Sequence, residues 1–116
     1  MRHVLRSRLG KKQGAKLRDI EYERQLDVDA RMRARYRVAR GRVSRFIVQL
    51  EVLAEGKWRP VVRYDTSHRF AHRDLYRRSG RVVKTDLKMS FDVALTYALD
   101  DLRDNWEIYR KVFLGG

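Results

Sequence analysis

The sequence contains no cysteine, and its 116 residues include only one proline. The missing cysteines exclude disulfide bonds, thiolate zinc sites and a cysteine nucleophile, and they favour a reducing, cytoplasmic location over secretion. No apolar run approaches the roughly 18 to 20 residues that cross a bilayer, so we expect no membrane segment. The single proline, Pro60, has no amide donor and is therefore expected at the start of a strand or on a sheet edge.

Familiar catalytic motifs are also missing. The sequence has no glycine-rich phosphate-binding loop, no G-x-S-x-G, no H-E-x-x-H and no recognisable DNA-reading helix-turn-helix. These absences argue against P-loop nucleotide hydrolysis, serine hydrolysis on an α/β-hydrolase fold and zinc-dependent proteolysis. We predict no cofactor and no metal.

Acidic residues are few, and positive charge dominates what is present. The chain has 28 Lys+Arg against 15 Asp+Glu, a net charge of +13. Residues 1–46 hold 15 Lys+Arg against 5 Asp+Glu, while residues 47–116 hold 13 against 10. Any function that depends on positive charge is therefore expected mainly in the first part of the chain.

Arginine far outnumbers lysine, and a guanidinium group suits bidentate phosphate contacts and stacking on bases. A basic domain of this size is typical of nucleic-acid binding, and we predict RNA as the partner. The predicted nucleic-acid-binding residues are Arg31, Arg33, Arg35, Arg37, Arg40, Arg42, Arg45, Arg69 and Arg73. The alternative is a non-enzymatic module that forms a homodimer through an exposed strand edge. In that case the positive charge only keeps the protein soluble.

The last segment is predicted as a long amphipathic helix. From Phe91 to Phe113, apolar residues recur in steps of three and four, the spacing of one helical face. Ser90 can cap its N-terminus. Its outer face is expected to carry a solvated acidic row of Asp100, Asp101, Asp104 and Glu107.

The middle of the chain reads as sequential antiparallel strands. The segments "RVSRFIVQLEVL", "KWRPVVRYD", "RFAHRDLYR" and "RVVKTDLK" alternate or are rich in strand-forming residues. The short turns "EG" (55–56) and "RSG" (78–80) separate them, which predicts a meander on which the final helix packs.

The first part is harder to assign. Residues 1–14 are expected to form a basic flexible tail, and 15–116 a single domain. Residues 15–31 favour a helix by composition, and "ARMRARYRV" then alternates as a strand to about residue 39, although its strong helix formers would allow the helix to run on to Val38. We predict an α+β fold: an N-terminal helix, an antiparallel meander of four to five strands, and a long C-terminal helix on one sheet face.

The stretch "RYDTSHRFAHRD" (63–74) is the candidate catalytic site. Strand alternation and the short loop at 66–69 could bring Asp65, His68, His72 and Asp74 together at one sheet end. In a metal-independent ribonuclease, His68 and His72 would exchange protons, Asp65 would orient an imidazole, and Arg63 would hold the phosphate.

Three other interpretations of the same stretch stay open. His and Asp side chains in a hairpin can simply form a local hydrogen-bonded pair. They can also hold zinc or manganese, but the spacing matches no strong signature and neighbouring arginines would repel a cation. The segment can also serve as a partner surface, with Tyr64 or Tyr76 stacking on a base.

Two resemblances bear on these alternatives. The run "GRVSRFIVQLEVLAEGKWRPVVRYDTSHRFAHRDLYRRSGRVVKTDL", followed by "ALTYALDDLRDNWEIYRKVF", resembles a small family of uncharacterised archaeal and bacterial proteins with a domain of unknown function, over residues of about 40–113. More distantly, "VVRYDTSHRFAHRD" is similar to the core of the TumE-like toxins of toxin and antitoxin pairs. That resemblance implies an RNA-directed toxin with an antitoxin partner, and it implies that Arg63, Tyr64, Asp65, His68 and His72 form the motif.

Overall fold

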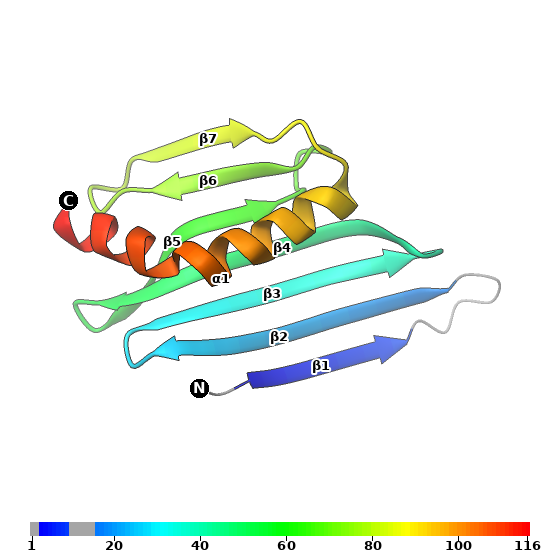
Figure 1. Ribbon diagram of the computed structural model, residues 1–116, viewed down its shortest axis with the longest axis horizontal. Helices are drawn as coiled ribbons and strands as arrows, with labels where there is room; N and C mark the ends of the chain where they lie inside the picture. The colour runs from blue at the N-terminus through cyan, green and yellow to red at the C-terminus, as the bar shows by residue number, and fades with distance from the viewer. Residues whose placement is uncertain (1–2, 10–15) are drawn as a thin grey trace.

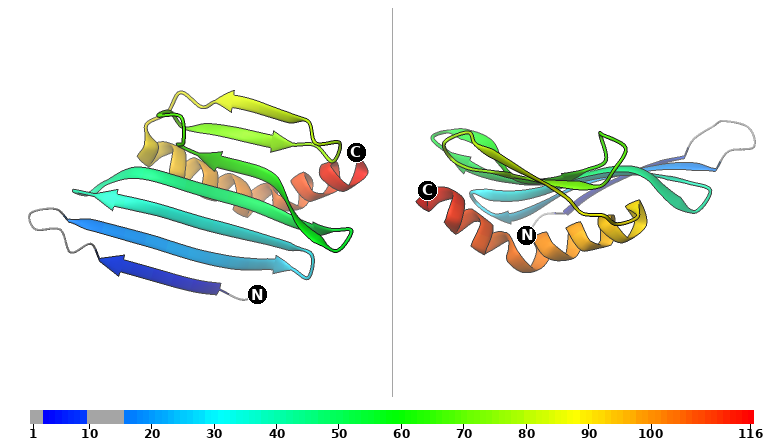
Figure 2. Two further views of the ribbon diagram at one scale, coloured as in Figure 1. Left: turned by 180° about the vertical axis from the view of Figure 1, so that it is seen from behind. Right: turned by 90° about the horizontal axis from the view of Figure 1, so that it is seen from above.

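The protein has two layers, a seven-stranded antiparallel sheet and one helix that crosses it (Figure 1). The computed structural model describes residues 3–9, as backbone only, and residues 16–116. The strands follow one another across the sheet in chain order: β1 (His3–Leu9), β2 (Leu17–Asp27), β3 (Ala30–Ala39), β4 (Arg42–Ala54), β5 (Lys57–Asp65), β6 (His72–Tyr76) and β7 (Val82–Asp86). The helix α1 (Phe91–Gly115) covers one face, and no other described element covers the opposite face (Figure 2). The α+β class and the meander are therefore confirmed.

The C-terminal helix begins as the sequence predicts. The hydroxyl of Ser90 accepts a hydrogen bond from the backbone N–H of Val93 at 3.3 Å, which satisfies one of the unpaired amides of the first turn. The helix packs chiefly on β4 and β5. In the part of the chain that the structure describes, no helix has the length and apolar character needed to cross a membrane.

The predicted N-terminal helix is wrong, because residues 17–27 form strand β2 and residues 30–39 form strand β3. Six strands follow residue 16, rather than four or five, and β1 precedes them. The reason is electrostatic complementarity between two neighbouring strands. One face of β2 carries Asp19, Glu21 and Glu23, and the antiparallel register sets them opposite Arg37, Arg35 and Arg33 of β3. A helix would have scattered these charges, whereas the strand pair stacks opposite charges across its ladder.

Residues 1–14 are expected from the sequence to form a flexible tail, but His3–Leu9 within this segment forms strand β1 and pairs with β2. The remainder of that segment falls outside the described residues.

Two tight turns of two residues each connect β3 to β4 and β4 to β5. In each turn the two central residues have positive φ: Arg40 (53°) with Gly41 (77°), and Glu55 (54°) with Gly56 (75°). This is the backbone of the two-residue hairpin turn that fits the twist of paired strands, and glycine adopts it at least cost. The turn at Glu55 and Gly56 lies where the sequence predicts it.

Pro60 lies inside β5, where its missing amide donor is accommodated locally. The register between β4 and β5 shifts beside Pro60, and β6 pairs with β5 only from Val62 to Asp65. One side of Pro60 therefore has no neighbouring strand, which agrees with the expectation of an edge-like position.

The core lies between α1 and the middle of the sheet. Its fully buried members include Ala94, Ala98 and Leu102 from the helix, Val48, Leu50 and Val52 from β4, and Val62 and Tyr64 from β5. The two alanines allow the helix to approach the sheet closely, and Leu102 fills the space between them and the strands.

Asp101 does not belong to the solvated acidic row predicted for the helix. Its Oδ2 accepts hydrogen bonds from the hydroxyls of Tyr64 at 2.5 Å and Tyr109 at 2.6 Å, and its Oδ1 accepts one from Asn105 at 2.8 Å. Burial, and then the bond to Asp101, raise the pKa of both tyrosines above the ordinary value of 10.0. The carboxylate thus supplies a polar attachment between the helix and β5.

These tyrosines predict a loss of stability at alkaline pH. Burial also raises the pKa of Tyr22 and Tyr76, so four of the six tyrosines ionise less readily in the folded protein than in the unfolded chain. Their contribution to stability is complete below a pH of about 10, the pKa in the unfolded chain, and decreases as the pH rises above it. We expect tyrosinate absorbance and loss of circular dichroism to rise together above that pH. Ionisation of all six tyrosines near pH 10 with unchanged dichroism would contradict this expectation.

Candidate functional site

The face of the sheet opposite α1, called the open face below, carries alternating basic and acidic side chains. It presents Asp19, Glu21 and Glu23 from β2, Arg31, Arg33, Arg35 and Arg37 from β3, Arg45, Ile47, Gln49 and Glu51 from β4, Arg63 and Asp65 from β5, and His72 and Asp74 from β6. The alternation predicted for "ARMRARYRV" is therefore confirmed, because its four arginines share one face and Met32 and Ala34 are buried on the other.

The four arginines of β3 are not equivalent. Arg37 forms two hydrogen bonds with Asp19, at 2.7 and 2.9 Å, and the Nε of Arg31 donates to Glu51 at 2.6 Å. Arg31 also lies over the ring of Trp58, with its guanidinium carbon 4.1 Å from the ring centre. Arg31 and Arg37 are therefore paired with acids of the neighbouring strands.

The other two arginines of the row are available to a ligand. Arg33 lies 3.7 Å from Glu23 and 3.9 Å from Glu51, distances at which no hydrogen bond forms, and its side chain is 53% exposed. Arg35, on the same strand, is exposed and forms no ion pair with any described residue.

Two adjoining hollows run along the open face. One, of about 380 Å³, lies over β2, β3, β4 and β5 and includes Arg33, Gln49 and Arg63. The other, of about 700 Å³, includes Arg35, Arg45 and Asp65 and ends at Ser67 in the β5–β6 loop. Both hollows are lined by Glu21, Arg35 and Ile47, so we treat them as one groove, called the open-face groove.

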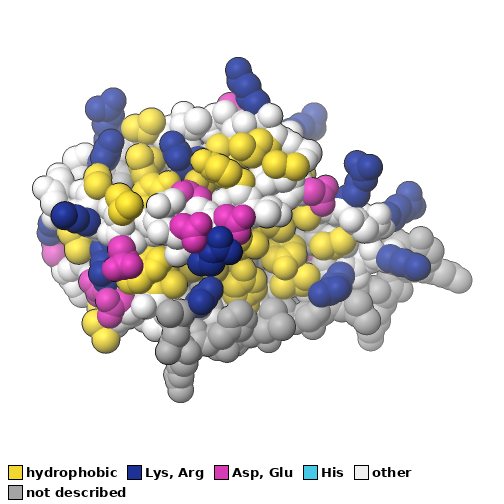
Figure 3. Space-filling model, viewed as in Figure 1, with side chains coloured by type: hydrophobic (Ala, Val, Ile, Leu, Met, Phe, Trp, Pro, Cys, Tyr) yellow, Lys and Arg dark blue, Asp and Glu magenta, His cyan; other side chains and the backbone are white. Residues whose placement is uncertain are grey.

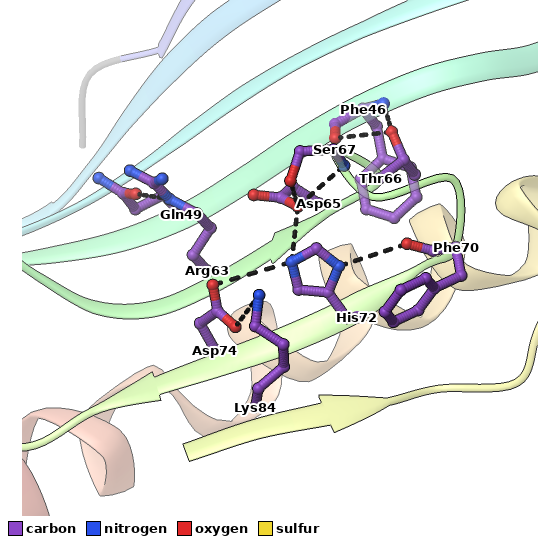
Figure 4. Close-up of polar contacts among 10 residues, drawn as sticks. All are labelled: Phe46, Gln49, Arg63, Asp65, Thr66, Ser67, Phe70, His72, Asp74 and Lys84. Atoms are coloured by element: carbon purple, nitrogen blue, oxygen red, sulfur yellow. Dashed lines mark hydrogen bonds and ion pairs between the residues drawn. The ribbon is translucent and has the colours of Figure 1, made fainter. Parts of the chain in front are cut away.

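At the loop end of this groove, Asp65, His72 and Asp74 form a buried cluster (Figure 4). Asp65 of β5 pairs in register with His72 of β6, and Asp74 follows two residues later on the same face. The Nε2 of His72 lies 2.8 Å from Oδ1 of Asp65 and 3.8 Å from Oδ2 of Asp74. The side chain of His72 is 1% exposed, and those of the two aspartates are 10% and 11% exposed.

The rest of the predicted catalytic set is arranged differently. His68 lies in the exposed loop, with its ring centre 5.5 Å from that of His72. Arg63 extends away from the cluster and donates from Nε to Gln49 at 2.6 Å (Figure 4). Asp65 also accepts hydrogen bonds from the backbone and the hydroxyl of Ser67, at 3.1 and 3.0 Å. The structure thus brings Asp65, His72 and Asp74 together, keeps His68 nearby and directs Arg63 elsewhere.

The remaining predicted arginines fall into two groups. Arg40 and Arg42 flank the β3–β4 turn and Arg69 lies in the β5–β6 loop, all exposed at the end of the molecule where the groove reaches Ser67. Lys and Arg side chains also stand out at this end when the helix side is viewed (Figure 3). Arg73 instead lies on the helix side, opposite Tyr64 in the β5–β6 register.

The open-face acids were missed by sequence reasoning, although a signal was present. In "DIEYER" (19–24), acids occupy alternate positions and Ile20 and Tyr22 lie between them, which is the period of a strand. The four arginines beginning at Arg31 have the same period, so the two segments are complementary when paired. Composition alone favoured a helix and hid this pattern.

Tyr64 cannot stack on a base in this structure. It is fully buried beneath the helix, where its ring lies edge-on to Tyr97 with centres 6.0 Å apart. Tyr76 is half-buried on β6 and stays available for that role.

Comparison with known proteins gives a family but no activity. A family model described as a domain of unknown function (DUF7718) matches residues 11–116. The match confirms the predicted resemblance to an uncharacterised family and extends it beyond residues 40–113 to the strands of the arginine-rich first part. No curated protein and no solved structure matches the chain.

Proposed function

The chain belongs to this family with a domain of unknown function, and we propose that it binds single-stranded RNA in the open-face groove. The observation that carries the proposal is the pair of groove arginines, Arg35 and Arg45, neither of which has an ion-pair partner among the described residues. A guanidinium group in a groove without a carboxylate partner is a site for phosphate, because the group's donors match two phosphate oxygens.

The surroundings of the groove support a phosphate ligand. Arg40, Arg42 and Arg69 lie exposed at its loop end, and the whole chain carries a net charge of +13. Arg31 and Arg37 hold the acids Glu51 and Asp19, so these two carboxylates are compensated. The groove lining itself holds as many acids as arginines, so the positive potential that an approaching strand meets comes mainly from the exposed arginines at the loop end. This attraction weakens with salt.

The shape of the face favours a single strand over a duplex. Reading a duplex commonly requires a helix or a β-ribbon that enters the major groove. The helix α1, the only helix among the described residues, is packed on the other face of the sheet. At the end of the groove, the exposed hydroxyl of Ser67 is a group to which a 2′-hydroxyl can hydrogen bond, which favours RNA over DNA.

The test is the affinity of a fluorescein-labelled, single-stranded RNA for the full-length protein, measured by fluorescence anisotropy over a range of salt concentrations. We expect the double variant Arg35→Ala/Arg45→Ala to bind about a hundredfold more weakly at low salt, since each of the two lost charge-assisted contacts is worth about 1.5 kcal/mol. The slope of log K against log salt should decrease by about 1.4, because each single-strand phosphate contact contributes about 0.7.

A matched control separates contact from overall charge. The variant Arg103→Ala/Lys111→Ala removes the same number of positive charges from exposed positions on α1, on the other side of the sheet. It should retain affinity to within about twofold, because exposed charges more than a Debye length of about 10 Å away are largely screened. Equal losses in both double variants, or no loss in the groove variant, would refute the proposed site.

The buried cluster gives less support to a metal-independent ribonuclease. A general base must reach the proton that it abstracts, directly or through one water. His72 is 1% exposed and its ring is enclosed by Asp65, Asp74 and Phe70, so a substrate strand does not reach it in this conformation. The toxin resemblance, the antitoxin partner and the homodimer stay predictions of the sequence.

A further inference from the structure

The Asp65, His72 and Asp74 cluster brings three metal-ligating groups together, and two of them have a buried polar atom without a hydrogen-bond partner. One ligand atom from each residue lies within 4.8 Å of the others, and all three residues are buried. The atoms Nε2 of His72 and Oδ1 of Asp74 are buried and have no hydrogen-bond partner. Nε2 is 2.8 Å from Asp65, but the direction of the contact is not that of a hydrogen bond.

The other nitrogen of His72 indicates which side of the ring faces the carboxylates. Nδ1 lies 3.3 Å from the carbonyl oxygen of Phe70, and because a carbonyl only accepts, Nδ1 is the donor. In the neutral imidazole this places the lone pair on Nε2, the ring nitrogen beside the two carboxylates. A backbone carbonyl that holds the second imidazole nitrogen is the usual support of a metal-binding histidine.

A lone pair facing two carboxylates is unfavourable unless a positive charge lies between them. Lys84 supplies part of this charge through an ion pair, but its Nζ is 3.7 Å from Oδ1 of Asp74, beyond hydrogen-bond distance, and its side chain is 45% exposed. The arginines expected to repel a metal do not face the cluster: Arg63 donates to Gln49 (Figure 4), and Arg73 lies on the helix side of the sheet. The sequence argument against a cation therefore does not hold for the folded protein.

We propose that Asp65, His72 and Asp74 bind a divalent transition-metal ion, Zn²⁺ or Mn²⁺. Neighbouring ligands of such an ion, each about 2.0–2.2 Å from it, lie roughly 3.0 to 3.4 Å apart, which falls between the 2.8 and 3.8 Å separations around Nε2. One imidazole with two carboxylates suits Zn²⁺ or Mn²⁺ better than Mg²⁺ or Ca²⁺, which prefer oxygen ligands alone. This site does not depend on the proposed RNA binding.

Wild-type protein provides the first test. Untagged, full-length protein is stripped with a chelator, dialysed and titrated separately with Zn²⁺, Mn²⁺ and Mg²⁺ by isothermal titration calorimetry. We expect one Zn²⁺ or Mn²⁺ per chain with a micromolar or lower Kd, binding of Mg²⁺ that is at least about tenfold weaker, and a rise in the unfolding temperature when metal is added.

Nuclear magnetic resonance of the histidine rings identifies the ligand directly. We expect the stripped protein to show neutral His72 protonated on Nδ1, with a Nε2 resonance that shifts when Zn²⁺ is added. The proposal would be overturned if His72 were protonated on both nitrogens at neutral pH and its resonances did not change when Zn²⁺ is added. A proton on Nε2 would then occupy the place proposed for the metal. This measurement needs no variant, so it decides the question even if a buried substitution fails to fold.

Substitution provides the matched comparison. Asp74→Asn keeps the shape of the side chain but removes its charge, and we expect it to weaken Zn²⁺ binding by at least about tenfold. Asp100→Asn makes the same change at an exposed residue of α1, on the other side of the sheet, and should change the Kd by less than about threefold. Equal affinity in Asp74→Asn and wild type would overturn the assignment.

Discussion

Replacing Asp101 with alanine is expected to lower the free energy of unfolding by about 3 kcal/mol, because each buried hydroxyl that loses its partner costs about 1 to 3 kcal/mol. The hydroxyls of Tyr64 and Tyr109 both donate to Oδ2 of this carboxylate. Tyr64 is fully buried, so water cannot replace the lost acceptor without opening the contact between helix and sheet.

Urea unfolding of the neighbouring variant Asp100→Ala is the control. Asp100 is exposed and forms an ion pair with Arg103 at 3.2 Å, so its loss should cost less than about 0.5 kcal/mol. A cycle with Tyr64→Phe should show a coupling between Tyr64 and Asp101 of about 1 kcal/mol or more, as expected for residues in direct contact. Equal stabilities for the Asp100 and Asp101 variants would mean that the hydroxyl bonds do not hold the helix in place.

Leu102→Ala is expected to cost about 3 to 4 kcal/mol, the usual range for a buried leucine whose removal leaves a cavity. Leu102 is fully buried and contributes to the core formed with Val48, Leu50 and Val52. α1 is the one described layer that covers this face of the sheet, so the cavity would open at the junction of the two layers. Urea unfolding would measure the loss in the free energy of unfolding. We expect the slope of this free energy against urea concentration to be the same as in wild type.

Leu114→Ala is the matched control on the same helix. Its side chain is 36% exposed, near the C-terminal end of α1, so the lost burial should cost less than about 1 kcal/mol. Similar losses for the two leucines would indicate that the helix is held mainly by its polar contacts and not by the apolar stripe.

The arginines show why a residue pattern predicts a face better than it predicts a function. Alternation placed Arg31, Arg33, Arg35 and Arg37 on one side of a strand, and the structure agrees. Which of these arginines are paired depends on acids from other strands: Asp19 binds Arg37, and Glu51 binds Arg31. A variant that removes all four would therefore damage the sheet as well as any RNA site, which is why the test of binding uses Arg35 and Arg45.

The stretch "RYDTSHRFAHRD" is a second case in which the pattern predicts which residues share a face but not the contacts that they make. Its alternation places Asp65, His72 and Asp74 where they can meet, because neighbouring strands joined by a short loop pair in a fixed register. Whether the imidazole faces solvent or carboxylates depends on the carbonyl of Phe70 and on burial by the surrounding sheet, neither of which leaves a local signature.

The sequence by itself determined the elements whose pattern is local: the amphipathic helix that begins after Ser90, the strands of the middle of the chain from residue 42 onward, and the glycine turn at 55–56. Only the tertiary structure decided that residues 17–27 form a strand, because their helix-compatible composition yields to cross-strand pairing with the arginines of β3. It also decided which arginines are free for a ligand and that His72 is buried between two carboxylates. These properties depend on contacts between residues far apart in the chain, which only folding brings together.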